Sequence, residues 1–157
     1  MRRIALVAIL LAVTIAPVSP AAGAPDFSGT WVLDPASAVD ARAGAANAPP
    51  KKVEIVVRQT GTTLSIDRKS GDRIETAVHH LDGTESVNKL PSGKEKKSTS
   101  TWVGSTLVIT SSTDMGTSTV PSTEIFSLSP NGRVMTIDVT LRTPGREIKR
   151  KLIYNKQ

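Results

Sequence analysis

Eight glycines between Gly61 and Gly145 recur at intervals of 10 to 16 residues, most of them in turn dipeptides such as Ser-Gly, Asp-Gly and Asn-Gly. Glycine suits tight turns because it adopts positive φ without a steric penalty. The intervening segments are rich in Val, Ile and Thr, which suit strands. This spacing predicts a meander of antiparallel hairpins. We expect about ten strands, at residues 27–33, 52–59, 63–69, 73–80, 85–90, 95–103, 106–113, 120–128, 133–142 and 146–155.

Three segments share one pattern after the turn glycine: GTTLSID at 61, GSTLVIT at 104 and GRVMTID at 132. Because strands alternate faces with period two, the third and fifth residues after each glycine fall on one face. We expect these apolar residues to point inward: Leu64, Ile66, Leu107, Ile109, Met135 and Ile137.

A meander with one apolar face per strand must bury that face, either by closing into a barrel or by folding into a sandwich. Pairing of strands in sequence order favours the barrel, which also removes exposed edges. Asp34-Pro35 followed by ASAVDARAG predicts one short helix after the first strand, ended by Gly44. The expected fold class is therefore all-β: a single antiparallel up-and-down barrel of about 8–10 strands with one short helix.

The N-terminus has the pattern of a secretory signal peptide: Arg2 and Arg3, an apolar run from Ile4 to Val18, and small residues before Pro25. We expect residues 1–24 to be removed and residues 25–157 to form one domain, exported to the periplasm or the medium. The chain has no cysteine, so its stability depends on packing and hydrogen bonds.

The net charge is +6, and it falls to +4 without Arg2 and Arg3. Aromatic residues make up only 3% of the chain, which disfavours stacking on single-stranded nucleic acid. We interpret the basic residues as a solvated surface, and we expect no nucleic-acid partner, no integral membrane segment in the mature chain and a monomer.

The same alternation places polar residues on the inner face, and buried charge is costly unless it is paired or hydrated. We expect the inward polar residues to be Thr76, His80, Ser98, Ser100, Ser111, Thr113, Glu124 and Arg150. In one interpretation Arg150 packs over Trp31 as a structural cation–π stack that closes one end. In the other, Arg150 with Tyr154 or Glu124 holds the polar head of a small ligand.

The sequence lacks recognisable catalytic and metal-binding patterns. The two histidines, His79 and His80, are adjacent and would point to opposite faces of a strand, and no HExxH or GxSxG motif occurs. We therefore predict no catalytic residues, no metal and no cofactor. An enzyme that uses His80 and Glu124 is the least favoured hypothesis.

The motif Gly29-Thr30-Trp31 on the first strand, with Arg150 or Lys151 on the last, resembles the calycin group, which includes lipocalins and fatty-acid-binding proteins. The segment FSGTWVLDPASA also resembles small secreted bacterial proteins that begin FxGTWxLDPAxS and are mostly of unassigned function. The resemblance implies a barrel closed by a tryptophan beneath a basic side chain. Arg150 and Tyr154 are four residues apart, whereas the fatty-acid clamp of that group needs a spacing of two.

Two main hypotheses follow. In the first, the barrel is not an enzyme and binds a small apolar or amphipathic ligand, which enters at the end away from Trp31. The candidate ligand-binding residues are Trp102, Glu124, Phe126, Arg150 and Tyr154, and the structural stack is Trp31 with Arg150. In the second, the barrel is filled, and its surface or loops bind a protein, for example as an inhibitor of a secreted enzyme.

Overall fold

The computed structural model describes residues 23–37, 52–116 and 118–157, and ten strands lie within them. The strands are β1 (Gly29–Leu33), β2 (Val53–Gln59), β3 (Thr63–Ser70), β4 (Arg73–His80), β5 (Ser86–Lys89), β6 (Glu95–Val103), β7 (Thr106–Asp114), β8 (Thr119–Leu128), β9 (Val134–Thr143) and β10 (Arg146–Lys156). The ten-strand meander expected from the glycine spacing is confirmed. The predicted signal peptide falls almost wholly outside the described residues and stays a prediction.

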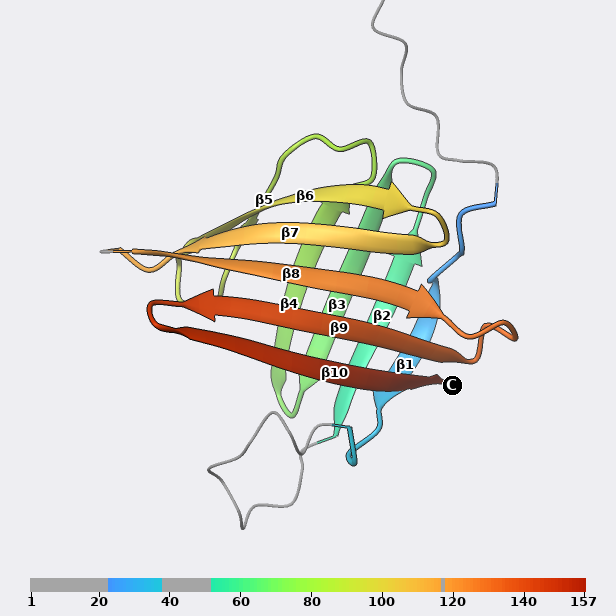
Figure 1. Cartoon of the computed structure of the whole chain (residues 1–157). Coiled ribbons are helices and arrows are strands. Elements are labelled where there is room, and N and C mark those ends of the chain that lie inside the picture. Colours follow the sequence, from blue (N-terminus) through green and yellow to red (C-terminus); the bar gives the residue numbers. More distant parts are fainter. Residues whose placement is uncertain (1–22, 38–51, 117) are drawn as a thin grey trace, which may run out of the picture.

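The strands form one antiparallel sheet in the order β4-β3-β2-β1-β10-β9-β8-β7-β6-β5. The first strand pairs with the last, so the sheet curls into a nearly closed barrel, and β4 and β5 are its two edges. Figure 1 shows β1–β4 running crosswise behind β6–β10, so that two walls face each other across the interior.

The expected inward phase of the three glycine-led strands is confirmed. Leu64, Leu107, Ile109 and Met135 are fully buried, and Ile66 and Ile137 are nearly so. They join Phe27, Trp31, Ile55, Phe126 and Tyr154 in one continuous core. Phe27 links the walls, since its ring stacks on Trp102 at 6.1 Å and meets Phe126 edge-on at 5.9 Å. The apolar half of the interior is therefore packed with side chains.

The predicted short helix is wrong, because the described residues contain no helix. Where the helix was expected to begin, residues 34–37 form a turn instead. The Asp34 carboxylate accepts a hydrogen bond from the amide of Ala36 at 2.9 Å, and the Ser37 amide donates to the Asp34 carbonyl at 3.1 Å. The Ser37 hydroxyl also accepts from the Ile153 amide at 3.0 Å, which fastens the turn to β10. Residues 38–44 of the expected helix lie outside the described residues. Within the described ranges, no helix is suited by length and apolarity to cross a membrane.

The expected phase of β4 is also wrong. The two-residue turn at Gly71 and Asp72 places Ile66 opposite Ala77 and Leu64 opposite His79. Paired residues share a face, so the odd-numbered residues of β4 point inward. His79 is therefore buried, while Thr76 and His80 are exposed. The expected register was wrong by one residue, so the expectation exchanged the inward and outward faces of this strand.

The basic side chain over Trp31 is Lys156, not Arg150. Register places Lys156 directly opposite Trp31, and the Lys156 Nζ lies 5.1 Å from the centre of the indole ring. The indole N–H donates to the Phe27 carbonyl at 3.0 Å. Gly29 completes the arrangement, because its φ is +141° and an added Cβ would lie 2.7 Å from the Lys156 Cε. The tryptophan-and-cation closure implied by the resemblance is thus present with a different cation.

Candidate functional site

A pocket lined by both charged and apolar side chains lies in the end of the barrel away from Trp31, and we call it the mouth pocket. Its volume is about 280 Å³, and its lining comes from strands on both walls and from the β5–β6 connection. The lining residues are Glu75, Leu90, Lys96, Thr113, Ser122, Glu124, Val139, Leu141, Ile148 and Arg150. A smaller inner pocket of about 40 Å³ adjoins it and shares Glu75, Leu90, Lys96 and Glu124.

A row of three serines lies beside this part of the interior, and one of them, Ser122, lines the mouth pocket. Ser98, Ser111 and Ser122 lie side by side on β6, β7 and β8, and all three are buried. Small side chains at facing positions leave volume that larger residues from the opposite wall or a ligand can occupy. Here Arg68 and His79 reach in from the opposite wall, at positions paired with Glu75 and Leu64 in the β3–β4 hairpin.

Lys96 and Glu124 form an ion pair inside the barrel, with 3.0 Å between the Lys96 Nζ and Glu124 Oε1 atoms. Burial alone would raise the pKa of Glu124, but the Lys96 ammonium and the Arg68 guanidinium outweigh it and hold the pKa below its usual value. Glu124 is therefore a carboxylate at neutral pH. Glu75 is the second carboxylate in the lining, so two acidic side chains face Lys96 and Arg150 in the mouth pocket. Arg68 adds a further positive charge from the adjoining inner pocket.

Two guanidinium groups in this region have buried atoms without a partner among the described residues. They are the Nε atoms of Arg68 and Arg150. The hydroxyl groups of Ser100 and Ser111 are also buried without a hydrogen-bond partner. An unpartnered buried donor costs free energy, so such groups call for water or a ligand. The unpartnered Nε donors of Arg68 and Arg150 make this region suited to an anion.

His79, on β4, lies near the Lys96–Glu124 ion pair. Its Nδ1 is 3.0 Å from the Ser98 hydroxyl on β6. Burial lowers the pKa of His79 to about 4, and the Glu124 carboxylate only partly offsets this effect. The imidazole is therefore neutral near pH 7 and adds no charge to the pocket.

The structure brings together only part of the predicted site. Glu124 and Arg150 both line the mouth pocket. Phe126 and Tyr154 are core residues with about 1% of their surface exposed. Burial raises the pKa of the Tyr154 phenol, and the nearby Arg68 guanidinium acts against this rise. Trp102 lies at the other end, where it lines a separate surface pocket with Leu81 and Gln59.

The sequence interpretation missed Arg68, Lys96, Glu75 and His79. The signal for two of them was available, since Arg68 follows Ile66 by two residues and Lys96 precedes Ser98 by two. Alternation gives each pair the same face. Glu75 and His79 were missed because the phase of β4 was assigned wrongly. Among the described residues, no group of three or more His, Cys, Asp or Glu side chains is arranged to hold a metal ion.

Comparison with known proteins identifies the fold alone. No protein-family model matches the sequence, and no curated protein matches it. Among solved structures, the chain is similar to that of a protein named "REP1-NXSQ fatty acid transporter", with a TM-score of 0.59 and 14% sequence identity over 83% of this chain and 95% of that one. This similarity supports the antiparallel barrel fold.

Proposed function

We propose that the mature chain is an exported barrel that binds a small amphipathic anion in the mouth pocket and does not act as an enzyme. The observation that carries this proposal is the buried Arg150 Nε, which has no partner among the described residues and lies at a pocket large enough for a small molecule. The similar solved structure is named as a fatty acid transporter, and this name supports a ligand of the same amphipathic kind.

The lining of the mouth pocket suggests how such a ligand would lie. The polar head would contact Arg150 and Lys96, and Arg68 would add positive potential from the adjoining inner pocket. The apolar part would contact Leu90, Leu141 and Ile148. Since the apolar half of the barrel is filled by Phe126, Tyr154 and their neighbours, the ligand's apolar part must be short or must extend out of the mouth.

A binding role also agrees with the state of the titratable groups. Glu124 is ionised and held by Lys96 at 3.0 Å, so it is poorly placed to donate a proton. His79 is neutral, and its Nδ1 atom is hydrogen-bonded to the Ser98 hydroxyl at 3.0 Å. Protein binding through the outer surface, the alternative from the sequence, stays a prediction.

Octanoate titrations test the proposal. We expect octanoate to bind, the uncharged analogue octanol to bind more weakly, and Arg150→Ala to weaken octanoate binding by about 10-fold or more, as expected for a lost charge-assisted hydrogen bond. Isothermal titration calorimetry measures each affinity.

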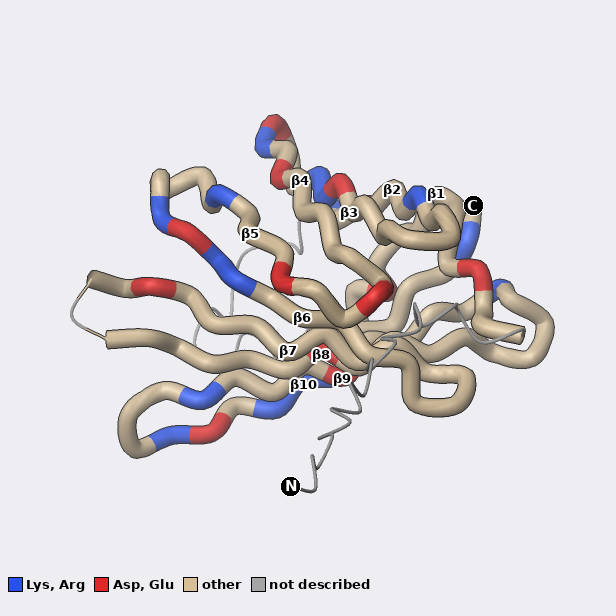
Figure 2. Tube along the Cα trace, turned by 90° about the horizontal axis from the view of Figure 1, so that it is seen from above, with Lys and Arg blue, Asp and Glu red and all other residues tan. Residues whose placement is uncertain are grey.

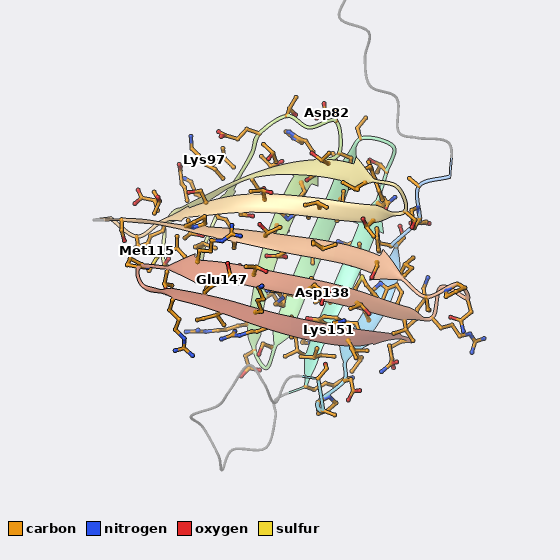
Figure 3. The ribbon with its side chains drawn as sticks, in the orientation of Figure 1. Asp82, Lys97, Met115, Asp138, Glu147 and Lys151 are labelled. Atoms are coloured by element: carbon orange, nitrogen blue, oxygen red, sulfur yellow. The ribbon has the colours of Figure 1, made fainter. Side chains whose placement is uncertain are left out.

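Lys151→Ala is the matched control. Lys151 is the next residue of β10, but its side chain lies on the outer wall beside Asp138, as Figure 3 shows. This variant should bind octanoate as the unaltered protein does. The proposal is contradicted if the Arg150→Ala variant binds octanoate as tightly as the unaltered protein, whether or not the variant is less stable. Arg150 would then have a structural role and no role in binding.

A further inference from the structure

Strand β4 has an unpaired edge along its first half, residues 73–76, which we call the free edge. Because β4 lies at one end of the strand order, only β3 is joined to it by a backbone ladder. Further along β4, side chains of β5 occupy the outer edge. The Val78 amide donates to Asn88 Oδ1 at 2.8 Å, and the His80 amide donates to the Ser86 hydroxyl at 2.7 Å. The backbone of the free edge makes no such contact among the described residues.

Two residues of the free edge, Ile74 and Thr76, direct their backbone N–H and C=O groups away from β3. Along an antiparallel strand these groups point alternately to one side and the other, residue by residue. Val78 bonds outward through both its amide and its carbonyl, so Ile74 and Thr76 have the same orientation. An edge of this kind is a template for pairing with another strand.

The side chains of the free edge also lack partners. Ile74 is 65% exposed, more than any other large apolar side chain of the described residues. Arg73 and Glu75 lie on the opposite face of the strand, on either side of Ile74, and neither takes part in an ion pair among the described residues. Figure 2 shows basic and acidic residues close together at the tip of the β3–β4 hairpin, which stands clear of the β5–β6 hairpin.

A second copy of β4 complements the free edge in one register. When two β4 strands pair antiparallel about a two-fold axis at Ile74, Arg73 of each copy lies opposite the partner's Glu75. The two Ile74 residues then form a hydrogen-bonded pair across the axis, with their exposed side chains on one face. The neighbouring register, with the axis at Glu75, would place two carboxylates directly opposite each other, and this arrangement is destabilising. Charge therefore selects the register centred on Ile74.

We infer that the free edge is a self-association site, at which β4 pairs with β4 of a second copy about a two-fold axis at Ile74. The product is a dimer in place of the monomer expected from the sequence. One short edge buries less surface than the roughly 1,200 Å² of a stable interface, so we expect a weak dimer with a Kd of about 10–300 μM. The inference does not depend on a bound ligand or on the function proposed above.

Charge reversal tests the register, with dimerisation measured by sedimentation equilibrium up to about 1 mM protein. Arg73→Glu and Glu75→Arg should each weaken dimerisation by about 10-fold or more, because each places like charges opposite each other on both sides of the axis. The double variant Arg73→Glu/Glu75→Arg restores opposite charges and should dimerise as the unaltered protein does. Arg133→Glu, the same change of charge in the β8–β9 turn, is the matched control and should have no effect. An unaltered protein that stays monomeric, or a double variant as weak as the single ones, would overturn the inference.

Disulfide cross-linking tests the position of the axis. The chain has no cysteine, so Ile74→Cys introduces a single thiol. In the proposed dimer the two Cα atoms at this position would be about 5.5 Å apart, which suits a disulfide. We expect oxidation to convert most of the Ile74→Cys variant into a covalent dimer on a non-reducing gel. Val103→Cys, at a position on β6 that is 61% exposed, is the matched control and should stay largely monomeric. Equal yields of covalent dimer from the two variants would reject an axis at Ile74.

Discussion

Replacing Trp31 with alanine should lower the free energy of unfolding by about 3–5 kcal/mol, the range typical of large aromatic side chains removed from a core. Trp31 has no exposed surface, donates its indole N–H to Phe27 and lies beneath Lys156. Alanine would leave a cavity and an unpartnered Phe27 carbonyl, and it would remove the cation–π contact. Urea unfolding followed by circular dichroism measures the change.

Trp102→Ala provides the comparison, since Trp102 is only partly buried and its indole nitrogen has no partner among the described residues. We expect a smaller loss of stability than at Trp31. If the Trp31 variant lost less than about 1 kcal/mol, its role in closing the barrel would be contradicted.

The second large expected effect is a loss of folding stability at acidic pH. His79 has a folded pKa of about 4 against an ordinary value of 6.5, so between these two values the unfolded chain binds more protons than the folded one. The free energy of unfolding therefore falls as the pH falls from 6.5 towards 4. At the lower pH, His79 alone has lowered it by about 3 kcal/mol relative to neutral pH. Above pH 6.5 this contribution to the pH dependence disappears.

Paired variants isolate this contribution, because Glu124 and other carboxylates also titrate near the acid end of the window. His79→Gln should show a flatter dependence of unfolding free energy on pH than the unaltered protein. His80→Gln, at the exposed neighbour, should retain the full dependence. Urea unfolding at half-unit pH intervals makes the comparison, and parallel curves for all three proteins would show that the imidazole of His79 is not held neutral by burial.

Local patterns predicted the strands well for a physical reason. Each hairpin turn stands beside the strands that it joins, so Gly61, Gly104 and Gly132 fix the positions of the residues that follow them. The inward phase of Leu64, Leu107 and Met135 could therefore be read from the sequence.

Non-local pairings could not be read in the same way. The cation over Trp31 depends on how β10 slides against β1, and that register places Lys156, not Arg150, opposite the indole. Arg150 is consequently free to line the mouth pocket. The helix expected after Asp34 fails for a related reason, since Ser37 is bonded to Ile153, a residue far away in the sequence.

The content of the interior also depends on packing that no single strand specifies. Phe126 and Tyr154 have the inward phase of ligand-binding residues, but each is fully enclosed by the opposite wall. What the sequence did not show is that Lys96 and Arg150 line the mouth pocket beside Ser122, with Arg68 in the adjoining inner pocket.

A crystal structure of the protein grown with octanoate is the most direct test of an anion site in the mouth pocket. The account predicts the carboxylate within hydrogen-bond distance of Arg150, with the alkyl chain against Leu141 and Ile148. Octanoate held only on the outer surface, with the Arg150 Nε bonded to protein atoms and no space beside it, would contradict the account.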